Sequence, residues 1–357
     1  MPFISNAQTI TQLRHNHYYE GKPITEFRTI PVKVDLKKGS FSFKAPAVFD
    51  RSAYCGTDSG KVYSVGLLNE GDFNGEVESL ADKTPKTYSV TGSILNAPFV
   101  TENLVIAGST SGFLTVFDRH SQAVTWKFKA KAPITTAPLF ALGMVYFASD
   151  DGKFYALDSI GKIKWKFDLK DKPASPAYDD SVIYLATTKS LIVALDAKTG
   201  KELWRSTAGG RTPCVGERFV YIINQNGALI ALDKKDGIDH WRYDDGENIS
   251  SSALEITLSR NTIIYSAEKK IIVMDPLTGV KQWEKEFEQR ICGDPMIVTD
   301  VVYVPCSDFH LYGVDLASGV KLAQADIGFA PYGSPAYADG KIFYPSKKVL
   351  YILSGKE

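Results

Sequence analysis

The 357-residue chain is poor in several features that mark common protein classes. Its four cysteines are too few and too scattered for a disulfide framework, and they contain no C-x-x-C spacing typical of zinc sites. Lysine plus arginine equals aspartate plus glutamate, at 41 each, so no net charge attracts nucleic acid. The longest apolar runs have the length of strands, well short of the roughly 20 residues that a membrane-spanning helix needs.

The sequence also lacks recognisable targeting and catalytic motifs. No basic start followed by an apolar stretch opens the chain, so we expect a cytoplasmic protein if Met1 is the native start, or otherwise a mature or trimmed form. Neither G-x-S-x-G, nor a P-loop, nor a dinucleotide fingerprint is present. His15 and His17 have no carboxylate or cysteine at a metal-ligand spacing, which favours a solvated tail. Cys292 and Cys306 flank one predicted hairpin, and we expect two buried free thiols rather than a disulfide.

What the sequence does contain is a period near 40 residues. Its five tryptophans follow one another at intervals of 39, 39, 37 and 42 residues, and an aspartate precedes each by seven or eight. They are Trp126, Trp165, Trp204, Trp241 and Trp283. A repeat of this length that contains four short strands per unit is typical of a β-propeller, in which each unit forms one blade.

Residues 176–207 illustrate the unit, with strands expected at 176–178, 182–187, 191–195 and 202–206. In the turn before the last strand, Asp196 can accept hydrogen bonds from backbone N–H groups, and Gly200 supplies a positive φ. The other aspartates at this turn position are Asp118, Asp158, Asp233, Asp275 and Asp315, and further turn glycines are Gly237, Gly279 and Gly319.

Counting the turn position gives eight units, the last of which ends before its fourth strand. Residues 25–34 belong to no unit and can supply that strand, which would leave no sheet edge open. We therefore predict an all-β, eight-bladed propeller of four-stranded antiparallel blades closed by an N-terminal strand, with seven blades as the alternative. Residues 25–357 form the single domain, after an N-terminal extension at 1–24. The first unit is oversized, which predicts a protruding insertion at about 67–92.

At this point a family resemblance becomes visible. The stretch ALDAKTGKELW at 194–204 resembles the tryptophan-docking repeat of the quinoprotein-type (PQQ-like) propellers, and FYALD at 154–158 and IIVMDPLTGVKQW at 271–283 are similar to it. The resemblance covers residues 40–354 and implies eight blades with each tryptophan packed between neighbours. One branch of that family consists of quinone-dependent dehydrogenases. The other is non-catalytic and includes the propeller lipoproteins of the outer-membrane barrel-assembly machinery.

The residues argue against the dehydrogenase branch. Such an enzyme would need a cationic grip on the quinone carboxylates, a calcium site, an aspartate base, an aromatic platform and commonly two adjacent cysteines. Here no two cysteines are adjacent, and the tryptophans are expected at the docking position rather than stacked on a ligand. Near the predicted axis only Lys44, Arg211 and Asp294 are charged. We therefore expect no enzyme, no bound cofactor and no metal, with these three as the only candidate funnel residues.

The sequence thus favours a non-enzymatic protein–protein interaction scaffold, and the insertion at 67–92 is a candidate docking element. The alternatives are a quinone- or metal-dependent oxidoreductase and a small-ligand-binding or sensor propeller with a site in the central funnel. We expect protein partners of unknown identity, no nucleic acid, no transmembrane segment and a monomer or a subunit of a larger complex. The resemblance implies a place in the cell envelope or periplasm. Ala323 replaces tryptophan in the seventh unit, and the first and eighth units also lack it, which predicts looser docking there.

Overall fold

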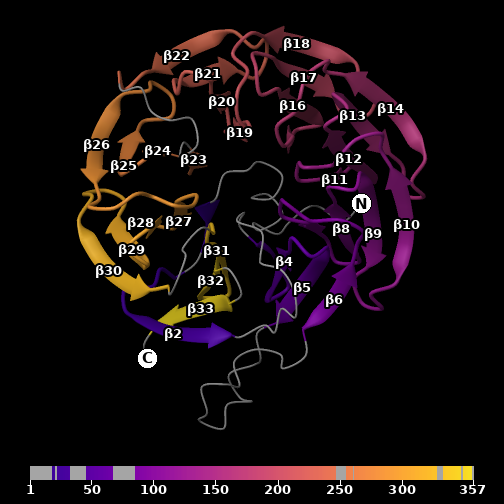
Figure 1. Ribbon diagram of the computed structural model, residues 1–357. Helices are drawn as coiled ribbons and strands as arrows, with labels where there is room; N and C mark the ends of the chain where they lie inside the picture. Colours follow the sequence, from indigo (N-terminus) through magenta and orange to yellow (C-terminus); the bar gives the residue numbers. More distant parts are fainter. Residues whose placement is uncertain are drawn as a thin grey trace.

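The computed structural model describes residues 18–20, 22–32, 46–66, 85–246, 255–259, 261–327, 333–346 and 349–355. Within these residues the chain forms eight β-sheets and no helix. The sheets stand side by side around a central axis and close into a ring (Figure 1). This confirms the predicted eight-bladed propeller and excludes the alternative of seven blades.

The first four blades follow one another along the chain, each with four antiparallel strands that run in order from the axis outward. Their strands are β3 Ala47–Phe49, β4 Ser52–Gly56, β5 Lys61–Gly66 and β6 Lys86–Ser89 in blade 1; β7 Phe99–Val100, β8 Leu104–Gly108, β9 Phe113–Asp118 and β10 Val124–Lys129 in blade 2; β11 Leu139–Ala141, β12 Met144–Ser149, β13 Lys153–Leu157 and β14 Ile163–Asp168 in blade 3; β15 Ala177–Asp179, β16 Val182–Ala186, β17 Ile192–Asp196 and β18 Glu202–Ser206 in blade 4.

The other four blades complete the ring, and the last of them combines both ends of the chain. Their strands are β19 Cys214–Val215, β20 Phe219–Ile223, β21 Leu229–Asp233 and β22 Asp239–Tyr243 in blade 5; β23 Glu255–Leu258, β24 Ile263–Ala267, β25 Lys270–Met274 and β26 Lys281–Glu286 in blade 6; β27 Met296–Val298, β28 Val301–Cys306, β29 His310–Asp315 and β30 Lys321–Asp326 in blade 7; β31 Ala336–Ala338, β32 Lys341–Ser346, β33 Val349–Gly355 and β2 Phe27–Val32 in blade 8.

The ring closes through the N-terminal strand β2, as predicted. It runs antiparallel to β33, and the register extends from Phe27 opposite Gly355 to Val32 opposite Leu350. A further strand, β1 Tyr18–Tyr19, was not predicted from the sequence, and it pairs in parallel with β27 at the inner edge of blade 7. Part of the predicted N-terminal extension therefore lies against the ring.

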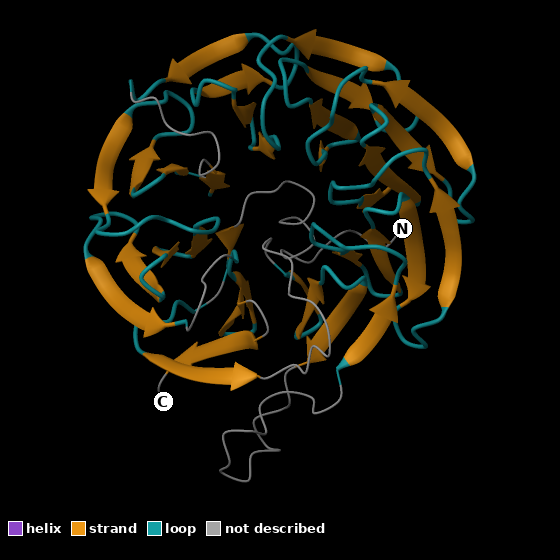
Figure 2. Ribbon diagram, in the orientation of Figure 1, coloured by secondary structure: helices purple, strands orange, loops and turns teal. Residues whose placement is uncertain are grey.

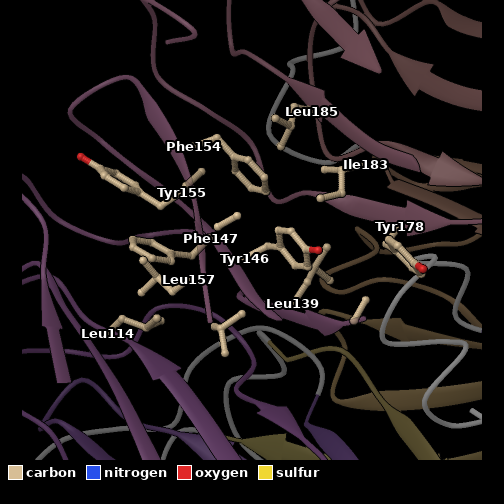
Figure 3. Close-up of a cluster of buried hydrophobic side chains, with 14 of the residues drawn as sticks. Leu114, Leu139, Tyr146, Phe147, Phe154, Tyr155, Leu157, Tyr178, Ile183 and Leu185 are labelled. Carbon is tan, nitrogen blue, oxygen red and sulfur yellow. The ribbon is translucent and has the colours of Figure 1, made fainter. Parts of the chain in front are cut away.

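Burial along the strands follows from how the blades pack. The third strands are buried on both faces by neighbouring blades, so β17 reads as an apolar run with Ile192 to Leu195 all buried. The outer strands have only one covered face, so β10 alternates between exposed and half-buried side chains. Figure 3 shows one apolar cluster, in which Leu114, Tyr146, Phe154 and Ile183 bring blades 2, 3 and 4 together.

Similar apolar clusters join the remaining pairs of neighbours, including blades 8 and 1 across the closure. The outer strands lie end to end around the circumference (Figure 2). Among the described residues, no helix has the length and apolarity to span a membrane.

Candidate functional site

The repeated tryptophans connect each blade to the next. Trp204 donates its indole N–H to Lys234 O of blade 5 at 2.8 Å, and this carbonyl belongs to the residue directly after the turn aspartate Asp233. The same contact joins Trp165 to Ala197 O, Trp241 to Pro276 O and Trp283 to Leu316 O, at 3.0–3.1 Å. The tryptophans thus lie on the outer strands between blades, away from the axis (Figure 1).

A buried tyrosine gives two of these carbonyls a second donor. Ala197 O accepts the hydroxyl of Tyr146 at 3.0 Å as well as the indole of Trp165. Pro276 O likewise accepts the hydroxyl of Tyr221 at 2.9 Å. These tyrosines were missed from the sequence, although one recurs at the third residue of the second strand in six blades: Tyr54, Tyr146, Tyr184, Tyr221, Tyr265 and Tyr303. The carbonyl after the turn aspartate is therefore the focus of the docking contact.

The turn aspartates shape the loop that presents this carbonyl. Asp196 Oδ1 accepts the N–H of Thr199 at 2.8 Å and its hydroxyl at 2.6 Å. These two bonds, the hydroxyl first, hold the pKa of the Asp196 carboxyl below its ordinary value. The carboxyl oxygens of the other five turn aspartates, Asp118, Asp158, Asp233, Asp275 and Asp315, also accept N–H groups of their own turns.

Glycine is required in this turn for two reasons: the backbone has a positive φ, and the tryptophan of the preceding blade leaves no room for a Cβ. Gly200 has a φ of 71°, and a Cβ placed on it would lie 2.6 Å from Cδ2 of Trp165 in the preceding blade. The same pairing places Gly161 under Trp126, Gly237 under Trp204, Gly279 under Trp241 and Gly319 under Trp283. Gln122, with a φ of 64°, takes the glycine position of the turn that begins at Asp118.

Blade 1 docks on blade 2 without a tryptophan. The fully buried Tyr88 of β6 donates its hydroxyl to Arg119 O at 2.7 Å, and Arg119 follows the turn aspartate Asp118. The Arg119 guanidinium forms an ion pair with Asp50 of blade 1 at 3.2 Å and lies 5.2 Å from the ring of Phe49. Tyrosine and arginine together thus supply at this junction the contacts that tryptophan supplies elsewhere.

At the junction of blades 7 and 8, the N-terminal segment provides the acceptor. Tyr303 of β28 donates its hydroxyl to Ile24 O at 2.9 Å and accepts the N–H of Ile24 at 2.5 Å. Ile24 lies shortly before β2, so its carbonyl takes the place of the turn carbonyl that the other blades offer. Phe27 packs against the Tyr303 ring at 6.1 Å, and Ala323 occupies the tryptophan position.

The structure describes two of the three candidate funnel residues, Arg211 and Asp294. Arg211 is half-buried in blade 5, where its backbone N–H donates to Ile223 O, and its charge opposes the burial-driven rise in the pKa of Tyr265. Asp294 is buried near blade 7, and its charge adds to burial in raising the pKa of Tyr19. Lys44 lies outside the described residues, as do His15 and His17.

The cysteines and the described metal-ligand residue types form no reactive cluster. All four cysteines are free thiols, and burial raises the pKa of Cys55 and of Cys292 to about 12. Cys292 donates to Pro305 O at 3.4 Å, on the strand that also carries Cys306. Within the described ranges, no three residues among His, Cys, Asp and Glu come close enough together to hold a metal ion.

Comparison with known proteins places the ring in a family. The family model described as outer membrane protein assembly factor BamB matches residues 47–175, 160–291 and 254–328. The chain belongs to this BamB family. It is similar to BamB of Moranella endobia (strain PCIT), with 25% identity over 274 residues that cover 71% of this chain and 60% of the relative. The chain thus spans less than two thirds of this curated relative.

Solved structures show the same fold in proteins of different kinds. BamB from Moraxella catarrhalis superimposes with a TM-score of 0.73 at 16% identity, covering 93% of this chain and all of that one. The quinohemoprotein alcohol dehydrogenase from Comamonas testosteroni reaches a TM-score of 0.76 at 13% identity, covering 97% of this chain and 80% of the enzyme. At these identities the likeness concerns the fold alone.

Proposed function

We propose that the chain is a non-enzymatic protein–protein interaction scaffold that acts in assembly of the bacterial cell envelope. The observation that carries this proposal is the match of the BamB family model, which extends over most of the ring. The geometry supports it, because the repeated tryptophans and aspartates are used in blade docking and turn formation. A ring held together in this way presents rigid loop faces on which partner proteins can dock.

The partners of such a scaffold are other proteins of the envelope, and the chain would act as a subunit of a larger complex. The predicted insertion is one candidate docking element. Of its range 67–92, residues 67–84 lie outside the described residues, whereas Lys86–Ser89 form β6 with the buried Tyr88. A deletion that tests the insertion must therefore stop before β6, so that the contact between Tyr88 and Arg119 is kept.

The experiment uses the tagged full chain expressed in its native host. After chemical cross-linking and affinity purification, we expect subunits of the outer-membrane assembly machinery among the partners, and lower levels of outer-membrane proteins when the gene is deleted. Deletion of 67–84 should abolish partner capture while the circular dichroism spectrum stays unchanged. Capture that persists would refute the role of the insertion. Absence of both the partners and the deletion phenotype would refute the scaffold itself.

One observation keeps an oxidoreductase as a second candidate. The ring superimposes on a quinohemoprotein alcohol dehydrogenase over 97% of this chain. Titration calorimetry with calcium and pyrroloquinoline quinone decides between the two functions, and we expect no binding. Quinone binding together with dye-linked oxidation of alcohols or sugars would replace the scaffold proposal. A thermal-shift screen of small molecules tests the third candidate, a ligand-binding sensor, in the same way.

A further inference from the structure

The outer strands of blades 4, 5 and 6 each balance an exposed basic side chain with an acidic one on the same strand. In blade 4, Arg205 donates to Glu202 at 2.6 Å. In blade 5, Arg242 donates to Asp239 at 2.6 Å, and in blade 6 Lys281 donates to Glu284 at 3.0 Å. These strands therefore present nearly neutral outer surfaces.

Blades 2 and 3 depart from this pattern. Their outer edge carries five exposed lysines, which we call the lysine rim: Lys127 and Lys129 on β10, and Lys162, Lys164 and Lys166 at the start of and along β14. Among the described residues, no carboxylate forms an ion pair with any of the five. Lys129 instead donates to Ser111 O and lies 4.5 Å from the ring of Phe113. The one acidic residue of β14, the exposed Asp168, accepts the N–H of Lys170 at 3.1 Å. The lysine rim therefore has an excess of positive charge that the outer strands of the next three blades lack.

The two parts of the lysine rim are neighbours. Trp126 on β10 packs against Gly161, and Lys162 directly follows that glycine. The nearby Asp158 carboxylate is engaged within its own turn, where it accepts the N–H of Lys162 at 2.9 Å. In Figure 1, β10 and β14 follow one another along the outer circumference. The lysines therefore form one continuous cationic stretch across the boundary between two blades.

Exposed apolar side chains accompany the lysines. Ile160, in the turn just before Lys162, is 75% exposed, and Val124 and Ile163, on the same two outer strands, are 44% and 42% exposed. A surface that mixes exposed aliphatic side chains with cations is typical of proteins that rest on anionic membranes, where the cations meet headgroups and the aliphatic groups enter the interface.

Two further features favour a lipid surface over a protein partner. All five cations are lysines, and lysine is depleted in protein–protein interfaces, where arginine and aromatic residues dominate. The lysines also stand on the convex outer edge of the ring, whereas a polypeptide partner gains most of its affinity from a complementary pocket. Lysine acts as a mobile point charge that needs no fixed partner geometry, which suits a fluid layer of headgroups.

From these observations we propose that the lysine rim, together with Ile160, docks this protein on a membrane surface rich in anionic phospholipid. Such docking goes beyond the scaffold function and does not depend on it. Protection of the strand edges alone does not account for the lysine rim, because blades 4 to 6 protect their outer edges with balanced pairs.

The test is cosedimentation of the full chain with vesicles of phosphatidylcholine alone, or of phosphatidylcholine mixed with phosphatidylglycerol. The rim variant replaces all five lysines by glutamine. A matched control variant removes the same number of cations from the outer strands of blades 4 to 7, namely Lys201, Arg205, Arg242, Lys281 and Lys321, also by glutamine. Thermal unfolding followed by circular dichroism establishes that both variants fold.

We expect the wild-type chain and the control to sediment with the phosphatidylglycerol vesicles only, and to be released at about 1 M salt, where the Debye length is about 3 Å. The rim variant should partition more weakly by a factor of about a thousand or more, since each of the five lysines contributes to binding an anionic surface. Ile160→Ser should weaken partitioning without abolishing it. Equal loss in both variants would show an effect of net charge and overturn the proposal. Two other results would also overturn the proposal: a rim variant that still binds the phosphatidylglycerol vesicles, and a wild-type chain that binds neither kind of vesicle. Poly-glutamate serves as an acidic polypeptide for comparison, and a wild-type chain that binds poly-glutamate but no vesicles would overturn it as well.

Discussion

Replacement of Trp204 by alanine measures how much one indole contributes to the ring. The Trp204 side chain is 7% exposed, its ring lies 5.9 Å from that of Tyr184, and its N–H bonds to Lys234 O. Deletion of a buried tryptophan side chain costs about 3–5 kcal/mol of unfolding free energy, because transfer free energy is lost and a cavity remains. About 1 kcal/mol of this belongs to the lost hydrogen bond. We therefore expect Trp204→Ala to destabilise the chain by about 3–5 kcal/mol.

The assay is urea unfolding followed by far-ultraviolet circular dichroism, since the substitution removes a fluorophore. Leu203→Ala is the matched control, because Leu203 is the preceding residue on β18 and is 51% exposed. Its loss should change stability by no more than about 0.5 kcal/mol. Trp204→Phe should fall between the two, since it keeps apolar contact but removes the donor to Lys234 O. If Trp204→Ala costs no more unfolding free energy than Leu203→Ala, the indole rings do not hold the blades together.

Three further substitutions or conditions test other contacts of the ring. Gly200→Ala should destabilise by more than Gly143→Ala in thermal unfolding, since both glycines have positive φ but only Gly200 faces a tryptophan ring; equal effects would contradict the steric argument. Tyr303→Phe should cost about 1–2 kcal/mol in the full chain and almost nothing in a chain without residues 1–24, if Ile24 is its partner. Because the pKa of Asp196 in the folded chain is lowered, its carboxylate stabilises the fold at pH values above the ordinary pKa of 3.8, and this stabilisation is lost as the pH falls through the lowered pKa. The urea midpoint of Asp196→Asn should therefore depend less on pH between about 5 and 2.5 than that of the wild type.

The sequence predicted the parts of the fold that repeat. A tryptophan and an aspartate at a constant offset reveal the unit, and the missing last strand predicts the partner of β33, because a ring leaves one strand to be supplied by the other chain end. The turn mechanism was also accessible, since Asp196 and Gly200 act through local backbone chemistry. Local contacts of this kind depend on a few neighbouring residues and can therefore be predicted from one sequence.

Contacts between distant segments were not accessible in the same way. Tyr303 and Ile24 are 279 residues apart, and no motif shows that one bonds the other. Tyr88 was missed because it lies two residues beyond the expected tryptophan position, which is occupied by Lys86 opposite Ser64. The expectation of looser docking at blade 1 considered only that position, and it overlooked that a tyrosine further along the strand reaches the same carbonyl.

The residues that replace tryptophan at some junctions show which contact the blade junctions have in common. Tryptophan and tyrosine differ in size, yet at the junctions served by Trp204, Tyr88 and Tyr303 a side-chain donor meets a main-chain carbonyl of the next blade or of the N-terminal segment. A buried carbonyl without a donor costs free energy wherever it lies, so each of these three junctions supplies a donor, but the residue that supplies it differs. The side chains on the outward faces of the same strands do not have to satisfy a buried carbonyl. The difference between the balanced strands of blades 4 to 6 and the lysine rim of blades 2 and 3 is therefore not a requirement of the fold, and function is the place to look for its cause.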